Sequence, residues 1–174
     1  YGEQCISGSW YCFDSVTGKI ATGFYNLPGK TVYYNSEGKM LHGEQKIGKY
    51  YYYFDPVYGS MYTGWKTINK KTRYYQKNGQ SVIGEGLING HWYYFDGNGI
   101  MQTGFVNLGS KTVYYNSNGQ MQYGEQCISG SWYYFDSITG KMTTGFYNLP
   151  GKTVYYNSEG KMLHGEQKIG KYYY

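Results

Sequence analysis

Aromatic and polar stretches alternate along the chain with a spacing of 20 or 21 residues. Each unit contains an aromatic run, then a polar stretch, and ends at a glycine that is followed by an aromatic residue or a glutamate. A fixed period of this length predicts a stacked repeat architecture rather than one globular core. The marker glycines are Gly23, Gly43, Gly64, Gly84, Gly104, Gly124, Gly145 and Gly165.

Within a unit the pattern predicts a β-hairpin. We expect an aromatic strand such as 9–13, a polar turn, and a short second strand such as 19–22. Asp14 precedes Gly18 by four residues and Asn35 precedes Gly38 by three, and this arrangement recurs along the chain. An Asp or Asn side chain bonds nearby backbone to start a turn, and glycine supplies the positive φ that closes it. No segment has helical periodicity, and a lone hairpin is marginal in water, so the sequence predicts an all-β solenoid of stacked hairpins.

The units alternate in pairs of about 41 residues. Odd units carry a longer aromatic run with an acid, such as 132–136, and end in Gly-aromatic. Even units begin their run with threonine, such as 112–116, and end in Gly-Glu. Residues 1–52 and 123–174 are nearly identical in sequence, with only four differences: Cys12/Tyr134, Val16/Ile138, Ile20/Met142 and Ala21/Thr143.

Composition changes what the core is made of. The 174 residues include 26 Tyr, 7 Phe, 4 Trp and 27 Gly, so aromatic rings must supply most of the buried apolar area. We expect one repeat module over 1–174, with about eight hairpins and a partial one, as a fragment of a larger protein.

Catalytic and metal-binding functions have little support in the sequence. His42, His91 and His164 lack the nucleophile and acid of a triad, and carboxylates that recur in every repeat do not form a single active site. We therefore predict no enzyme, no metal and no cofactor. The three cysteines form no recognisable disulfide framework, no apolar run is long enough to span a membrane, and rings with lysines do not form a recognised nucleic-acid module.

Several motifs resemble the cell-wall-binding repeats of Gram-positive surface proteins and lysins, the group of choline-binding and glucan-binding repeats. They are Gly-Ser-Trp-Tyr-Tyr-Phe-Asp at 130–136, Gly-Lys-Met-Thr-Thr-Gly-Phe at 140–146 and Gly-Ile-Met-Gln-Thr-Gly-Phe at 99–105. The resemblance implies a secreted, non-catalytic β-solenoid at the bacterial cell surface. It also implies ligand sites between hairpins, and dimers through terminal hairpins. The net charge of +5 suits an anionic polymer such as teichoic acid, or is a solvated patch.

By resemblance, each ligand site is a cage of rings around a quaternary ammonium. We expect the leading ring of an odd unit to join the ring after the next marker glycine, completed by a tyrosine of the neighbouring hairpin. The pairs are Trp10 with Phe24, Tyr51 with Trp65, Trp92 with Phe105, and Trp132 with Phe146, and the completing rings are Tyr33, Tyr74, Tyr114 and Tyr155. The alternative for all these rings is packing between repeats.

The chain departs from the choline pattern at every second marker, where glutamate replaces the aromatic residue. Glu85 precedes Trp92, and Glu125 precedes Trp132, by seven residues. Such a pair could bind a cation, or a sugar whose ring stacks on the aromatic side chain. Alternatively, the glutamate faces solvent and pairs with Lys46 or Lys168. Three functions therefore stay open: recognition of choline on teichoic acid, binding of glucan or another surface carbohydrate, and a structural spacer or self-association module.

Overall fold

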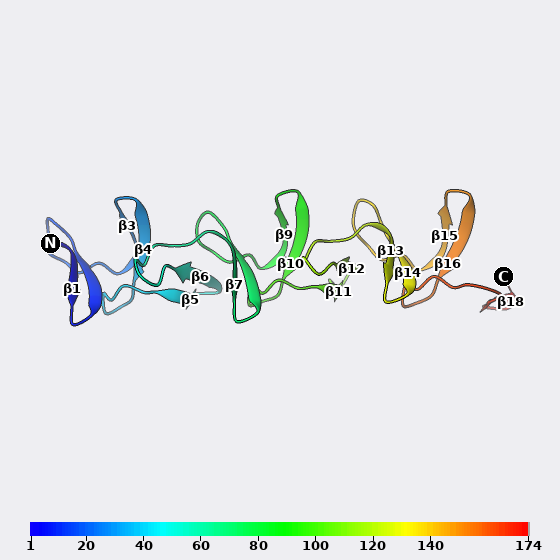
Figure 1. Ribbon diagram of the computed structural model, residues 1–174, viewed down its shortest axis with the longest axis horizontal. Coiled ribbons are helices and arrows are strands. Elements are labelled where there is room, and N and C mark those ends of the chain that lie inside the picture. Colours follow the sequence, from blue (N-terminus) through cyan, green and yellow to red (C-terminus); the bar gives the residue numbers. More distant parts are fainter. Residues whose placement is uncertain (174) are drawn as a thin grey trace. The chain divides into compact units, whose positions relative to one another are not determined.

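The computed structural model describes residues 1–173, and they contain strands and turns but no helix. Figure 1 shows the strands as a succession of short ribbons along the chain. The strands are β1 (Gly2–Ile6), β2 (Ser9–Phe13), β3 (Gly23–Leu27), β4 (Lys30–Tyr34), β5 (Gly43–Ile47), β6 (Tyr50–Phe54), β7 (Gly64–Ile68), β8 (Lys71–Tyr75), β9 (Gly84–Ile88), β10 (His91–Phe95), β11 (Gly104–Asn107), β12 (Thr112–Tyr115), β13 (Gly124–Ile128), β14 (Ser131–Phe135), β15 (Gly145–Leu149), β16 (Lys152–Tyr156), β17 (Lys168–Ile169) and β18 (Tyr172–Tyr173).

Each strand pairs only with its neighbour in sequence, which gives nine two-stranded sheets over the described residues. In the first hairpin Gly2 lies opposite Phe13 and Ile6 opposite Ser9. The two residues between these strands, Ser7 and Gly8, have φ values of 51° and 79°. Positive φ at both central residues is the backbone of the tight hairpin turn that matches strand twist. The predicted all-β class with stacked hairpins is therefore confirmed.

The predicted choice of paired strands was wrong. The partner of the aromatic strand β2 is β1, which begins at Gly2 as later strands begin at the marker glycines, and not the segment 19–22. That segment contributes a single bridge, between Phe13 and Ile20. The physical reason is the turn: two residues join β1 to β2 in close register, whereas the longer Asx loop leaves room for one bridge before the next marker glycine turns the chain.

The predicted Asx turns are confirmed. Asp14 Oδ1 accepts hydrogen bonds from the backbone N–H of Thr17 at 2.7 Å and of Val16 at 3.1 Å. Gly18 closes the loop with a φ of 71°. Asn35 plays the same part in the next repeat, where its Oδ1 accepts from the N–H of Glu37 and Lys39.

Successive hairpins pack front to back within each compact unit. We call the front face the side that carries the residue after the marker glycine and the leading residue of the aromatic strand, as Glu3 and Trp10 do in β1–β2. The opposite side is the back face, and it supplies the buried residues Val32 and Tyr34 in β3–β4. The core therefore consists of small clusters at each junction, such as Cys12, Val32, Tyr34 and Met40.

One backbone hydrogen bond recurs at each junction and fixes its register. The N–H of Met40 donates to the carbonyl of Trp10 at 2.8 Å. The same bond, at 2.7–2.8 Å, joins Met61 to Thr31, Ser81 to Tyr51, Met101 to Thr72, Met121 to Trp92, Met142 to Thr112 and Met162 to Trp132.

The chain divides into two compact units. The first contains residues 1–86 and 95–101, and the second contains residues 87–94 and 102–174. That the whole chain acts as one module stays a prediction. Tyr172 is exposed at the end of the described chain, whereas Tyr174, which the sequence places in an exposed terminal cluster, lies outside the described residues, and so does the side chain of Tyr173.

Candidate ligand site at the hairpin junctions

The junctions are of two kinds, because odd and even hairpins present different front faces. Glu3 and Trp10 lie on one front face, and Phe24 and Thr31 lie on the next. We name each junction by its main front-face ring. We call the residue after a marker glycine the marker glutamate or the marker ring, and Glu3, which follows Gly2, is counted as a marker glutamate. The Trp10, Tyr51 and Trp132 junctions combine a ring with a marker glutamate. The junctions of Phe24, Trp65, Phe105 and Phe146 combine a marker ring with a threonine.

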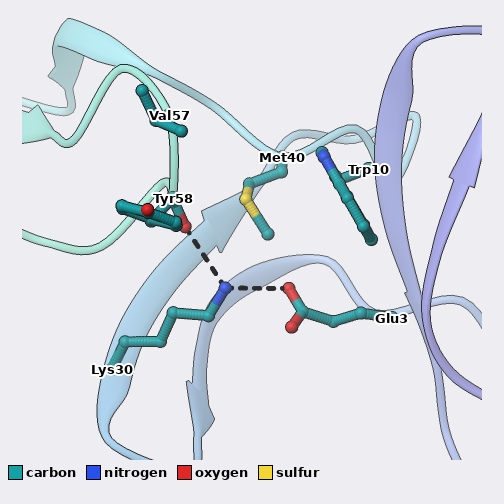
Figure 2. A pocket seen from close by; sticks show the side chains of 6 residues that line it. All are labelled: Glu3, Trp10, Lys30, Met40, Val57 and Tyr58. Atoms are coloured by element: carbon teal, nitrogen blue, oxygen red, sulfur yellow. Dashed lines mark hydrogen bonds and ion pairs between the residues drawn. The ribbon is translucent and has the colours of Figure 1, made fainter.

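A pocket of about 320 Å³ opens at the Trp10 junction. Trp10 forms one wall and remains 41% exposed. In Figure 2 the Lys30 ammonium lies between the Glu3 carboxylate and the Tyr58 carbonyl, with Met40 close by. The Lys30 Nζ is 3.1 Å from Glu3 Oε1 and 3.2 Å from the Tyr58 oxygen.

This pocket combines three kinds of group that suit an organic ligand. The indole face attracts a cation or stacks on a sugar ring, the Met40 thioether offers apolar contact, and the carboxylate offers charge or accepts hydroxyl protons. The Lys30 ammonium already balances the charge of Glu3. Any external cation therefore has to compete with Lys30 for this carboxylate.

The Trp132 junction repeats this arrangement with a looser ion pair. Lys152 Nζ lies 3.8 Å from Glu125 Oε1, and Trp132 is 42% exposed. Glu125 and Trp132 share the front face of one hairpin, as the sequence predicted for this pair. Burial, followed by the nearby Glu125 charge, raises the pKa of the Tyr156 hydroxyl.

A buried tyrosine of the back face also approaches the marker glutamate. The Tyr34 hydroxyl donates to Glu3 at 3.5 Å, and the Tyr75 hydroxyl donates to Glu44 at 2.9 Å. Burial is the main cause that raises the pKa of both tyrosines far above the ordinary value, and the carboxylates add to it. Each hydroxyl therefore stays protonated and holds its glutamate in place.

The Tyr51 junction is closed by an arginine. Arg73 is 3% exposed, and its Nη1 lies 2.6 Å from Glu44 Oε1. Its guanidinium carbon lies 4.1 Å from the centroid of the Tyr51 ring. A ring and a carboxylate thus hold a cation here, but the cation belongs to the protein.

The junctions with marker rings contain direct ring contacts, although Phe24 stays 45% exposed and Phe146 52% exposed. Phe24 meets Tyr33 edge-on at a centroid distance of 4.9 Å and Tyr52 at 5.1 Å. These are the spacings of aromatic pairs that stabilise a core. The equivalent contacts are Trp65 with Tyr74 at 5.0 Å, Phe105 with Tyr114 at 4.9 Å and Phe146 with Tyr155 at 4.9 Å. The completing tyrosines predicted from the sequence therefore do contact their marker rings.

The predicted grouping of leading rings with marker rings was wrong. Trp10 lies in β2 and Phe24 in β3, so these rings belong to consecutive hairpins and to different junctions. The error follows from the wrong choice of paired strands. The same separation applies to Tyr51 and Trp65, to Trp92 and Phe105, and to Trp132 and Phe146.

The predicted glutamate partners were also wrong where the structure shows them. Glu44 pairs with Arg73 rather than with Lys46, whose Nζ lies 5.6 Å from the Tyr51 ring centroid. Glu125 pairs with Lys152. The sequence reasoning missed these cations, although a signal was present: lysine precedes the threonine of every even unit, and Arg73 stands where the other even units have valine.

The described residues contain no cluster of three or more His, Cys, Asp or Glu side chains that could hold a metal ion. Cys5, Cys12 and Cys127 are free thiols. Among the described elements there is no helix of the length and apolar character that a membrane span needs.

Stacked hairpins with ring-lined crevices define a repeat-type binding module. A family model described as the choline-binding repeat matches residues 21–63, 62–102 and 102–147. The chain therefore belongs to the choline-binding repeat family. No curated protein sequence matches it.

Solved structures agree with this assignment. Choline binding protein F of Streptococcus pneumoniae is 31% identical with a TM-score of 0.80, over 88% of this chain and 55% of that chain. The same values apply to a structure of that protein in the presence of a peptidoglycan analogue. This chain thus spans little more than half of choline binding protein F. The choline-binding domain of CbpL from the same organism is 24% identical, over 93% of this chain and 86% of that one, with a TM-score of 0.68, and it shows the shared fold.

Proposed function

We propose that this chain is a non-catalytic cell-wall-binding module that recognises choline residues of teichoic acids at the surface of a Gram-positive bacterium. Membership of the choline-binding repeat family supports this proposal. The observation that carries it is the pocket at the Trp10 junction, where an exposed indole, a thioether and a carboxylate surround about 320 Å³ of space.

In this proposal the trimethylammonium group of choline lies on the Trp10 face and contacts Met40. The ring quadrupole attracts the cation, and each good contact of this kind contributes about 0.5–2 kcal/mol. Glu3 supplies the counter-charge, and Lys30 gives way or shares the carboxylate. The Trp132 junction offers a second site of the same design with a longer ion pair.

Repetition then raises the affinity for a polymer whose ligands also repeat. Several weak sites on one chain bind such a polymer more tightly than one site does, by factors of about 10² to 10⁴ when the spacing fits. The module would in this way hold an attached protein at the cell surface after secretion. Dimerisation through terminal hairpins stays a prediction.

A second candidate is a glucan or another surface carbohydrate. The paired charges of Glu3 and Lys30 leave the pocket without net charge, and an exposed indole suits the face of a pyranose. The carboxylate and the ammonium would then bind hydroxyl groups. The third candidate, a structural spacer, requires that all rings serve packing alone.

Titration with choline separates these candidates. We expect saturable heat by calorimetry and a change in tryptophan fluorescence, with Trp10→Ala and Trp132→Ala each removing one site. Phe24→Ala is the matched control, because this ring packs at the other kind of junction: it should lower the melting temperature and leave choline binding intact.

Retention on dextran that choline cannot displace would reject the choline proposal in favour of carbohydrate. If Trp10→Ala and Trp132→Ala lower the melting temperature without changing any ligand affinity, the spacer function is the correct one.

A further inference from the structure

At the Tyr51 junction a cationic side chain of the protein itself lies between a ring and a carboxylate. Arg73 comes from the middle of β8 and points into the junction between the second pair of hairpins. Its guanidinium lies over the Tyr51 ring and bonds Glu44 Oε1 at 2.6 Å. Its Nε donates to the carbonyl of Asn98 at 3.1 Å.

Arg73 and Lys30 bond the same pair of acceptors in their respective junctions. Lys30 bonds the marker glutamate Glu3 and the carbonyl of Tyr58, the residue before turn Gly59. Arg73 bonds the marker glutamate Glu44 and the carbonyl of Asn98, the residue before turn Gly99. The position of these two acceptors is therefore a built cation site, filled by a different residue in each junction.

The two cations differ in the space that they leave. Lys30 reaches its acceptors from the edge of β4 and leaves a pocket beside Trp10. Arg73 reaches them from the position that Val32 occupies in the other junction, and it fills the space on the ring. The equivalent positions in the remaining even units are also valine, at Val113 and Val154.

A second exchange makes room for the arginine. Ser81 stands where Met40 stands in the Trp10 junction, and both donate their backbone N–H to the leading residue at 2.8 Å. Ser81 is fully buried, and its Oγ accepts from the N–H of Tyr51 at 3.0 Å. A larger residue at position 73 thus accompanies a smaller one at position 81, which keeps the junction filled.

We propose that Arg73 is an internal ligand, which fills a binding site for small organic cations at the Tyr51 junction and closes this junction to choline. The ligand class is a monovalent alkylammonium or guanidinium ion held between a ring face and a carboxylate. Junctions with a marker glutamate are then not equivalent, since the Trp10 junction, which has valine, is open and the Tyr51 junction, which has arginine, is closed. The inference rests on the proposed function for its choice of choline as the first probe.

Replacing the three residues should open the junction. The variant Tyr51→Trp/Arg73→Val/Ser81→Met gives it the ring, the valine and the thioether of the Trp10 junction, with exposed Lys71 in the place of Lys30. We expect calorimetry with choline to show one additional site per chain relative to the unchanged protein. A folded variant with an unchanged number of sites would overturn the proposal.

The reverse exchange gives a matched control in the same chain. Val32→Arg/Met40→Ser should close the Trp10 junction, so that one choline site disappears while binding at Trp132 persists. If this variant retains every choline site, an arginine at this position does not close a junction to choline, and the proposal fails.

Arg73→Val alone, with methylguanidinium as the probe, separates this inference from the choline proposal. We expect methylguanidinium to bind this variant and raise its melting temperature more than it changes that of the unchanged protein. If the unchanged protein binds no choline but the variant binds methylguanidinium, the choline function fails and the internal ligand stands. An equal response of both proteins would contradict the internal ligand, whatever choline does.

Discussion

Glu3 is the residue on which the ligand site depends most. Its carboxylate receives the Lys30 ammonium and the Tyr34 hydroxyl, and its side chain is still 28% exposed. An ion pair at this degree of exposure contributes little free energy, typically about 0.2–1 kcal/mol. Lys30 is therefore a weak occupant, which an external cation with better ring contacts can replace.

Removing Lys30 should strengthen choline binding at the Trp10 junction. Lys30→Met keeps most of the apolar side chain and frees the Glu3 carboxylate, so we expect the dissociation constant to fall about twofold to fivefold. Calorimetric titration measures it. Lys39→Met is the control, because Lys39 pairs with Glu37 in an exposed turn. Weaker binding by the Lys30 variant would show that the ammonium contacts the ligand instead of competing with it.

Single residues could be predicted only in part from the sequence. The leading rings are visible as part of the repeat and the marker glutamates as departures from the choline pattern, and Glu125 does share a face with Trp132. The cations were missed because Lys30 lies 27 residues from Glu3, and Arg73 lies 29 residues from Glu44. Such pairs depend on how one hairpin is aligned on the next, and this alignment could not be predicted from the sequence.

At the scale of the hairpin, the Asx turn makes stability depend on pH. Backbone N–H groups of Thr17, Tyr58 and Thr139, in that order, are the main cause that lowers the pKa of Asp14, Asp55 and Asp136 below the ordinary value. The folded state therefore prefers the charged carboxylate. This stability is present above the unfolded pKa of about 3.9 and is lost as the pH falls through the lower folded value.

Replacing these three aspartates with asparagine should reduce the loss of unfolding free energy that occurs as the pH falls. Asparagine keeps the acceptor, as Asn35 demonstrates, but has no proton to gain. Urea unfolding at neutral pH and below pH 4 should show a smaller acid loss for the triple variant than for the unchanged protein. Equal acid losses would mean that these turns do not contribute.

The glycine that closes each turn is a second requirement of the hairpin. Gly79 has a φ of 79°, and an added Cβ would collide with the Met61 side chain. Gly79→Ala should therefore lower the free energy of unfolding by about 1–2 kcal/mol from the backbone alone. Gly97→Ala is the control, because nothing lies within 4 Å of its added Cβ and its φ is not left-handed. Thermal unfolding compares the two, and similar losses would contradict the account of the turn.

The positions of the strands and turns were predicted better than the pairing of the strands. The aromatic strands, the Asx turns and the repeat length followed from periodicity and turn chemistry. The pairing was wrong because each aromatic strand lies between two polar turns, and both turns are compatible with a hairpin. The hairpin forms at the tight turn of Ser7 and Gly8, because both residues adopt positive φ. A Ser-Gly pair is a weaker sequence signal for this turn than Asn-Gly.

At the scale of the whole molecule, junctions with different roles alternate along one chain. Junctions such as that of Phe24 supply aromatic contacts beside a polar pocket. The junctions with a marker glutamate supply internal cations and, beside Trp10, a pocket with a carboxylate. Because stacked repeats interact mainly with their neighbours, the two roles need not compete. The period of about 41 residues that the sequence predicts is the length over which these roles repeat.

Choline should stabilise the folded chain if its sites exist only in stacked hairpins. Ligand at about 100 times its dissociation constant adds about 2.7 kcal/mol per site. The melting temperature should therefore rise with the logarithm of choline concentration, and less steeply for Trp10→Ala. Sodium chloride at equal ionic strength controls for screening. A melting temperature that choline leaves unchanged would favour the spacer function.

The most direct test of the central claim is a crystal structure of the chain grown with choline. The account predicts choline on the indole faces of Trp10 and Trp132, beside Glu3 and Glu125, with Arg73 still on Tyr51. Choline bound against Phe24 or Phe105, or in place of Arg73, would contradict it.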